Sequence, residues 1–147
     1  MSHDLKLERL LDGTPDEVFE AFTDADAMLE WYQDNAGWVV EVLECDVRVG
    51  GTTTVSFGSA EERYVEVMTY TQVESGRRLA YTERFEKPDG SIFDTAITIT
   101  FEPHDGKTLL TIVQTGFPNV EERDGHQGGW PGFIDRLERV VAKRRAA

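Results

Sequence analysis

The sequence has one cysteine, no long apolar run and few basic residues, and each shortage excludes a class of protein. Cys45 has no second cysteine to pair with, so an internal disulfide is impossible. No apolar run approaches the ~18 residues needed to span a bilayer. The opening residues, MSHDLKLERL, lack the apolar segment of a secretory signal. We therefore expect a cytoplasmic protein that does not enter a membrane.

Basic residues are outnumbered by acidic ones, which bears on the possible partners. Lys and Arg total 15 against 28 Asp and Glu, giving a net charge of -13. This charge repels phosphate backbones and anionic headgroups, so we expect neither a nucleic acid nor a membrane as partner. We interpret the acidity as a solubility feature, with attraction to a basic partner surface as the alternative.

Motifs of several common active sites are also missing. The sequence contains no GxSxG, P-loop, GxGxxG or CxxC pattern, which weakens the hydrolase, NTPase and dehydrogenase interpretations. Its three histidines, His3, His104 and His126, show no metal-ligand spacing. We therefore expect no metal and no fixed cofactor.

What the sequence does contain is regular alternation of apolar and polar residues. Its 147 residues, 1–147, suffice for one domain around one core. Period-two alternation predicts strands over residues 3–11, 38–49, 52–58, 62–73, 79–86, 92–102 and 107–116. Short turns at Gly76, Gly90 and Gly106 separate the last four strands, which indicates an antiparallel meander. Because Cys45 falls inside a predicted strand, we expect it to be a small buried hydrophobe.

Helix signals follow the first strand and precede the C-terminus. Thr14 and Glu17 form a capping box, and Thr23-Asp24 is a second start signal, so two short helices are predicted before residue 32. Apolar residues recur at steps of three and four from Trp130 to Val141 and predict a long terminal helix. Because Pro131 suits a first turn, we expect this helix to begin near Gly129 or Trp130, with residues 119–127 as a separate turn.

Gly50-Gly51 interrupts an otherwise alternating stretch. The pair is either a kink that lets a curved sheet turn a corner or a simple turn between two strands. Both interpretations make it architectural. The order of elements predicts an α+β fold in which a curved antiparallel sheet wraps around the C-terminal helix, with two short helices between the first and second strands.

Four segments carry a family resemblance that covers nearly the whole chain. They are TPDEVFEAFTDADAMLEWY at 14–32, DVRVGG at 46–51, RRLAYT at 77–82 and GGWPGFIDRL at 128–137. Together they resemble the activator of heat-shock protein 90 ATPase homologue family, within the START-like (SRPBCC) superfamily of birch-pollen-allergen-like helix-grip proteins. The resemblance implies a hydrophobic-ligand cavity between the sheet and the terminal helix. It transfers no universal catalytic residue.

Residues from several predicted elements should converge under the terminal helix. The predicted cavity wall comprises Trp31, Trp38, Arg48, Tyr64, Tyr81, Glu83, Phe93, Trp130, Phe133 and Leu137. Glu83 shares strand parity with inward-facing apolar residues, and a Glu83–Arg48 pair inside the cavity is one hypothesis for how its charge is balanced. The alternative is that the aromatic residues fill a solid core.

Three functions are compatible with these observations. The first is a non-enzymatic protein, monomeric or homodimeric, that binds a small hydrophobic ligand such as a lipid. The second, implied by the resemblance, is a co-chaperone-like module of the stress response that contacts a heat-shock protein 90 homologue. The third is a cyclase or dehydratase in which Glu83 or His126 would serve as acid or base. We expect binding rather than catalysis.

Overall fold

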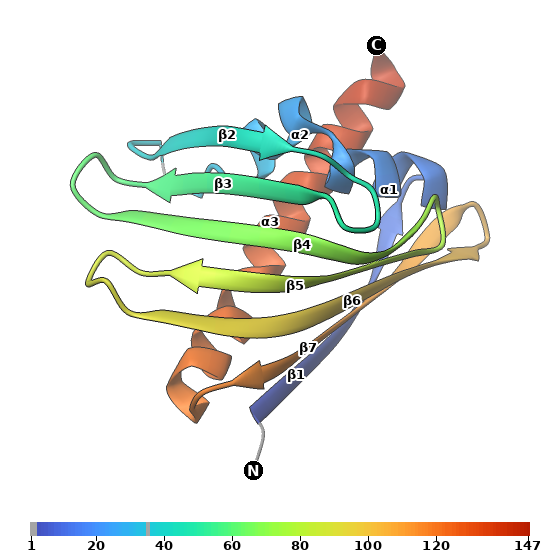
Figure 1. The fold of residues 1–147 in the computed structure, drawn as a ribbon. Helices are drawn as coiled ribbons and strands as arrows, with labels where there is room; N and C mark the ends of the chain where they lie inside the picture. The colour runs from blue at the N-terminus through green and yellow to red at the C-terminus, as the bar shows by residue number, and fades with distance from the viewer. Residues whose placement is uncertain (1–2, 35) are drawn as a thin grey trace.

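The computed structural model describes residues 3–34 and 36–147, and these form a curved antiparallel sheet against helices (Figure 1). The sheet order is β1-β7-β6-β5-β4-β3-β2. Its strands are β1 (His3–Asp12), β2 (Val39–Cys45), β3 (Thr52–Gly58), β4 (Arg63–Glu74), β5 (Arg78–Glu86), β6 (Ile92–His104) and β7 (Lys107–Phe117). The helices are α1 (Pro15–Thr23), α2 (Ala25–Trp31) and α3 (Val120–Ala146). The predicted α+β helix-grip architecture is confirmed.

The two short helices form where the capping signals lie. At α1, the Thr14 hydroxyl accepts from the Glu17 N–H while the Glu17 carboxylate accepts from the Thr14 N–H. At α2, the Asp24 carboxylate accepts from the Ala27 N–H at 3.1 Å. Local hydrogen bonds therefore start both helices, and burial of Val18 and Phe22 fixes the face that packs on the sheet.

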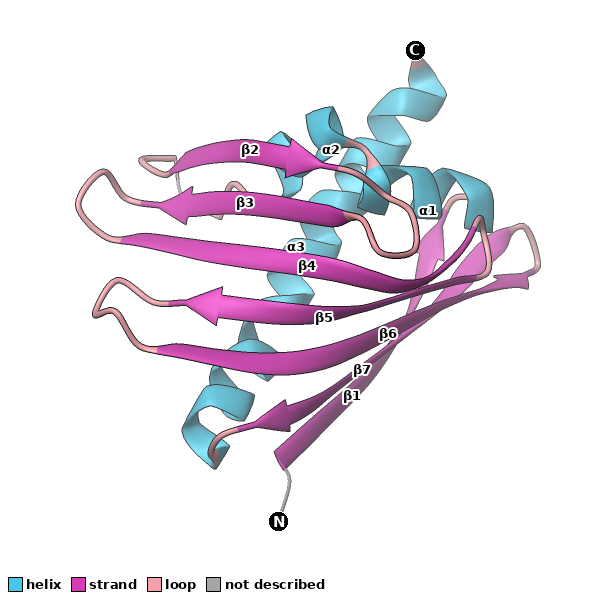
Figure 2. Cartoon of the chain, in the orientation of Figure 1, coloured by secondary structure: helices cyan, strands magenta, loops and turns pink. Residues whose placement is uncertain are grey.

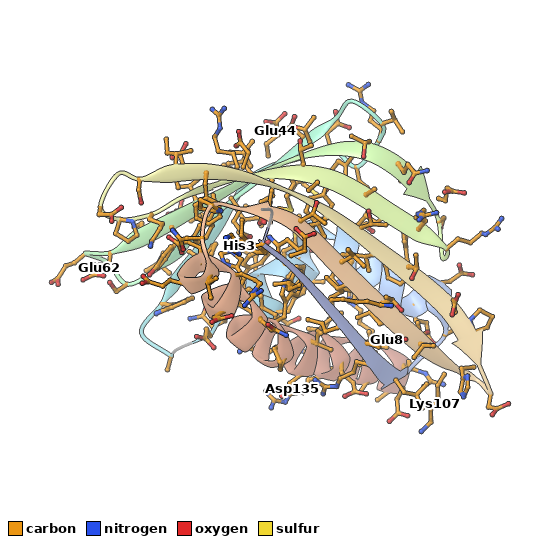
Figure 3. The ribbon with its side chains drawn as sticks, turned by 90° about the horizontal axis from the view of Figure 1, so that it is seen from below. His3, Glu8, Glu44, Glu62, Lys107 and Asp135 are labelled. Carbon is orange, nitrogen blue, oxygen red and sulfur yellow. The ribbon has the colours of Figure 1, made fainter. Side chains whose placement is uncertain are left out.

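All the helices lie on the concave side of the sheet (Figure 2). Seen from below, the sheet arches over α3, and Asp135 lies on the outer side of that helix (Figure 3). In β6, Ile97, Ile99 and Phe101 are buried while Asp94 on the other face is exposed. Trp130, Ile134 and Leu137 of α3 are buried in the same core. No helix of the described ranges is long and apolar enough to cross a membrane.

The terminal helix is longer than the sequence predicted. It begins at Val120, where the Asn119 side chain accepts from the Glu122 N–H, and continues through Pro131 to Ala146. The prediction of a start near Gly129 or Trp130 was therefore wrong. Proline removes one hydrogen bond from a helix interior. Here the packing of Trp130 and Ile134 on either side of Pro131 holds the helix together.

The Gly50-Gly51 pair lies in a turn, because β2 ends at Cys45 rather than at residue 49. Gly50 has a φ of +84°, and a Cβ on Gly51 would lie 2.2 Å from the Asp46 carbonyl oxygen. The Gly50 N–H also donates to the Tyr70 carbonyl at 2.9 Å. Glycine is thus required at both positions. Cys45 is exposed at this strand end, so the prediction that it would be buried was wrong.

Candidate functional site

A cavity of about 290 Å³ lies between the concave face of the sheet, α2 and the N-terminal half of α3. Its walls are mostly aromatic, and all three tryptophans of the chain contribute to them. The lining residues are Trp31, Tyr32, Trp38, Phe57, Tyr64, Glu66, Tyr81, Glu83, Phe85, Lys87, Glu122, Gly125, His126, Gly129, Trp130 and Phe133. The space is close to the lower end of the ~300–1,000 Å³ typical of small-molecule sites.

Stacked rings on neighbouring strands form one wall of the cavity. Phe57 of β3 and Tyr64 of β4 are cross-strand partners with ring centroids 5.6 Å apart. Tyr64 stacks in turn on Phe85 of β5 at 5.5 Å. Trp38 lies 5.8 Å from Phe57 at the other end of this row. The alternation of these strands brings the rings to one face, which gives the wall flat, polarisable surfaces.

Two carboxyl groups lie at the polar end of the cavity. Glu66 on β4 and Glu83 on β5 are diagonal neighbours on the inner face, and they are 6% and 4% exposed. The charge of Glu66 acts on the nearby carboxyl of Glu83. The Tyr32 hydroxyl donates to Glu66 Oε1 at 2.6 Å. Because burial and a like charge nearby both disfavour ionisation, the carboxyl of Glu83 favours its protonated form.

The surroundings of this pair shift the pKa of several groups. Burial raises the pKa of Glu83 well above its ordinary value of 4.5, and the neighbouring charge of Glu66 adds to the effect. Burial also raises the pKa of Tyr32 and of Tyr81, with the nearby carboxyls reinforcing the shift. Both tyrosines therefore remain protonated hydroxyls that can donate hydrogen bonds.

Gln114 of β7 connects the carboxyl pair to the roof of the cavity. Its Nε2 donates to Glu83 Oε2 at 3.2 Å and to the Thr95 hydroxyl at 2.9 Å. Its Oε1 accepts from the indole Nε1–H of Trp130 at 2.9 Å. This fully buried amide fixes the position of both Glu83 and the Trp130 ring.

The mouth of the cavity is framed by the first turns of α3. Lys87, just after β5, pairs with Glu122 at 2.8 Å. The His126 ring packs among Phe85, Phe93 and Phe117, with centroids 4.8, 5.9 and 5.0 Å away. These contacts hold the N-terminal part of α3 over the sheet. The longer helix is thus what closes this side of the cavity.

Seven of the ten residues predicted for the cavity wall do line it. They are Trp31, Trp38, Tyr64, Tyr81, Glu83, Trp130 and Phe133, and His126 lies there as well. Phe93 and Leu137 instead pack in the surrounding core. Arg48 lies in the turn after β2, with its side chain 72% exposed and paired with Asp46. The hypothesis of a Glu83–Arg48 pair was therefore wrong, because β2 ends before Arg48 reaches the inner face.

Several lining residues escaped the sequence prediction. They are Tyr32, Phe57, Glu66, Phe85, Lys87, Glu122, Gly125 and Gly129. Glu66 carried a signal, because it alternates with Tyr64 and Met68 on β4 in the same way that Glu83 alternates with Tyr81 and Phe85 on β5. No sequence signal pointed to Lys87 or Glu122, because only the early start of α3 brings these two residues together. Among residues 3–34 and 36–147, no three His, Cys, Asp or Glu side chains are grouped to hold a metal ion.

Comparisons with known proteins agree with this geometry. The family model described as Activator of Hsp90 ATPase homolog 1-like protein matches residues 12–142. A crystal structure from Chromobacterium violaceum is 31% identical, with a TM-score of 0.83 over 94% of this chain and 96% of that one. The solution structure of an AHSA1-like protein from Aeromonas hydrophila is 20% identical, with a TM-score of 0.76 over 99% and 96%. No curated protein is significantly similar to this sequence.

Proposed function

Because the chain belongs to the Activator of Hsp90 ATPase homolog 1-like family and encloses an aromatic cavity, we propose that it binds a small hydrophobic molecule between the sheet and α3. The observation that carries the proposal is the unfilled space itself. A domain of this size normally packs its core to a density that leaves few voids larger than water. A cavity lined by three tryptophans and six tyrosines and phenylalanines departs from that rule in the way that ligand sites do.

The proposal is tested by blocking the mouth of the cavity. Gly129 lines the cavity and Gly128 does not, while a Cβ at either position meets nothing within 4 Å. Gly129→Leu should therefore obstruct entry, and Gly128→Leu is its matched control on the same helix. We expect the neutral dye prodan to bind the native protein with energy transfer from tryptophan. Gly129→Leu should weaken this binding by about tenfold, equivalent to ~1.4 kcal/mol.

Native mass spectrometry supplies the second test. Protein purified without denaturation should carry a non-covalent small molecule that is released on unfolding. Equal dye binding by the Gly129→Leu and Gly128→Leu proteins would place the dye outside this cavity. A ligand-free spectrum together with no dye binding by the native protein would contradict the proposal.

A second candidate function is acid–base catalysis on the bound molecule. The observation that favours it is that Glu83, whose pKa is raised well above 4.5 by burial, lies inside an aromatic cavity where a protonated carboxyl could act as an acid. His126 at the mouth is the other titratable candidate. The protein would be incubated with a cell extract and the small molecules compared by mass spectrometry. A compound consumed by the native protein but not by Glu83→Gln would support catalysis, and identical profiles would oppose it.

A role with a chaperone is a separate hypothesis that rests on the family's description and on the net charge of -13. An acidic surface would attract a basic surface of a heat-shock protein 90 homologue, and salt would screen the attraction. Stimulated ATP turnover by such a chaperone that falls as salt rises would support this role. If the protein does not stimulate the ATP turnover of the chaperone at low salt, the chaperone role is contradicted.

A further inference from the structure

The carboxyls of Glu66 and Glu83 are buried without a cation. The hydrogen-bond donors that reach them are the Tyr32 hydroxyl and the Gln114 amide, and both are neutral. Among the described residues, no Lys, Arg or His forms an ion pair with either carboxyl. Lys87, the lysine that lines the cavity, has its ammonium on Glu122 at the mouth. Within the described residues, the pair therefore has no positive partner.

Two adjacent buried carboxyls do not stabilise a fold by themselves. Removing ionisable groups from water is costly, and a neutral amide pair of similar shape would make comparable hydrogen bonds at lower cost. Both residues are nevertheless oriented by well-formed hydrogen bonds rather than turned toward solvent. This arrangement fits a site that receives a positive charge from a ligand.

The aromatic walls favour the same kind of ligand. The row Trp38, Phe57, Tyr64 and Phe85 lines the same cavity as the carboxyls. The negative face of an aromatic ring attracts a cation, and the attraction grows where water is excluded. Flat rings also stack on a planar apolar group. The walls and the polar end therefore suit different parts of one amphipathic molecule.

The hydroxyl of Tyr81 is an independent indication of a ligand. Tyr81 is only 6% exposed and lines the cavity beside Glu83. Unlike Tyr32 and Tyr70, whose hydroxyls donate to Glu66 and Thr53, it makes no hydrogen bond within the described part of the chain. Among the described residues, the fully buried side-chain atoms without a partner are Arg63 Nε and Arg136 Nη2, so the Tyr81 hydroxyl is open to the cavity. A polar atom of a ligand would satisfy it.

On the basis of the proposed function, we infer that the ligand is a planar apolar amine whose protonated nitrogen lies between Glu66 and Glu83 while its ring system stacks on the aromatic wall. The ammonium keeps its own protons. The proton that the Glu83 carboxyl held is released to solvent, because this carboxyl ionises beside the cation. The net charge of -13 also attracts a cation toward the protein.

A matched pair of probes tests the inference. 2-Naphthylmethylamine is a cation near neutral pH, and 2-naphthalenemethanol has nearly the same shape without the charge. We expect the native protein to bind the amine at least tenfold more tightly at pH 8, measured by quenching of its tryptophans. Calorimetry in two buffers of different ionisation enthalpy should show protons released on binding of the amine and none on binding of the alcohol.

Variants of the carboxyl pair identify the source of the preference. The Glu66→Gln/Glu83→Gln double variant should lose the preference for the amine and still bind the alcohol. The groups that face the pair are Tyr32, Tyr81 and Gln114, with Lys87, Glu122 and His126 at the mouth. The Glu61→Gln/Glu102→Gln double variant, which removes two charges at exposed positions outside the cavity, should leave the preference in place.

The outcomes separate this inference from the proposed function. Equal affinity for the amine and the alcohol, or binding of neither while prodan still binds, overturns the amine assignment and leaves a neutral hydrophobic ligand in place. A preference for the amine that survives in the double variant also overturns it, because the charge would then be recognised elsewhere. Failure of prodan and both naphthalene probes to bind a ligand-free protein overturns the proposed function itself.

Discussion

At the scale of single residues, the carboxyl of Glu83 is in an environment far from that of water. Burial raises its pKa from 4.5, and the adjacent Glu66 raises it further. A carboxyl whose pKa is higher in the folded protein binds its proton more tightly there than in the unfolded chain. Its contribution to stability is complete below pH 4.5 and is lost as the pH rises through the folded pKa.

Replacing Glu83 with Gln should therefore flatten the pH dependence of stability. The native protein should lose stability as the pH is raised from about 5 to 9, whereas Glu83→Gln should lose less, because an amide can donate to Glu66 and accept from Gln114 without titrating. Denaturant unfolding at several pH values measures the free energy of unfolding of both proteins.

The pKa values of Glu17, Asp24 and Asp135 are lowered, so these groups change the stability only at a pH below this range. Glu102→Gln, at an exposed position of β6, is the control, and parallel curves for all three proteins would contradict the prediction.

The hydroxyl of Tyr32 should matter more than an ordinary buried hydroxyl. Tyr32→Phe removes the donor to a buried carboxyl, so it should lower the free energy of unfolding by about 1.5–3 kcal/mol. Tyr70→Phe removes a buried hydroxyl that donates to the neutral Thr53 at 2.7 Å, and it should lower that free energy by about 0.5–1.5 kcal/mol. Urea unfolding measures both. A loss at Tyr70→Phe as large as that at Tyr32→Phe would show that the carboxyl partner adds nothing.

At the scale of elements, the sequence of the first half of α3 is unfavourable for a helix. Gly125, Gly128, Gly129 and Gly132 lower helix propensity, and Pro131 removes a hydrogen bond from the interior. The helix forms because its side chains are held from outside. His126 packs among three phenylalanines, and Lys87 pairs with Glu122. Tertiary contacts here outweigh local propensity.

Pro131→Ala should stabilise the protein. Pro131 is exposed, so the substitution restores a helical hydrogen bond without changing the core, and it should raise the free energy of unfolding by about 1–3 kcal/mol. Gly128→Ala, three residues earlier on the same helix, should raise it by about 0.5–1 kcal/mol through propensity alone. Thermal unfolding measures both changes. A destabilised Pro131→Ala protein would mean that the proline conformation is required by its contacts.

At the scale of the whole molecule, the sheet and α3 share one core, and the cavity occupies only part of the space between them. Leu137 is 1% exposed and lies outside the cavity, in the core around it. The C-terminal end of α3 is also tied to the short helices, since Lys143, Arg144 and Arg145 pair with Glu30, Asp24 and Glu17. The fold can therefore be weakened without altering the ligand site.

Leu137→Ala should separate stability from binding. It should lower the free energy of unfolding by about 2–5 kcal/mol, because it leaves a void in the core. The affinity for prodan should not change, since Leu137 does not line the cavity. Leu29→Ala, at a position 42% exposed, is the control and should change stability by about 0.5 kcal/mol or less. A loss of dye binding by folded Leu137→Ala protein would mean that the cavity extends to this residue.

Much of this molecule follows from the order of its residues. The capping box of α1, the Asp24 cap of α2, the glycine turns and the period-two strands are local signals, and they were enough to predict the sheet, the two short helices and the helix-grip class. Strand parity also placed Glu83 and Tyr81 on the inner face. The positions that failed were those where the local signal ends or conflicts with packing. Arg48 continues a strand pattern past the end of β2, Cys45 is exposed at that end, and Pro131 suggests a helix start that the structure does not use.

The sequence by itself determined which faces are apolar, because alternation and helical periodicity depend only on neighbouring residues. Only the tertiary structure decided which polar groups meet. Glu66 and Glu83 become neighbours through the register of β4 on β5, and Gln114 of β7 reaches Trp130 on α3. Such encounters depend on sheet curvature and on where α3 starts, and these are set by the packing of the whole chain rather than by any one segment.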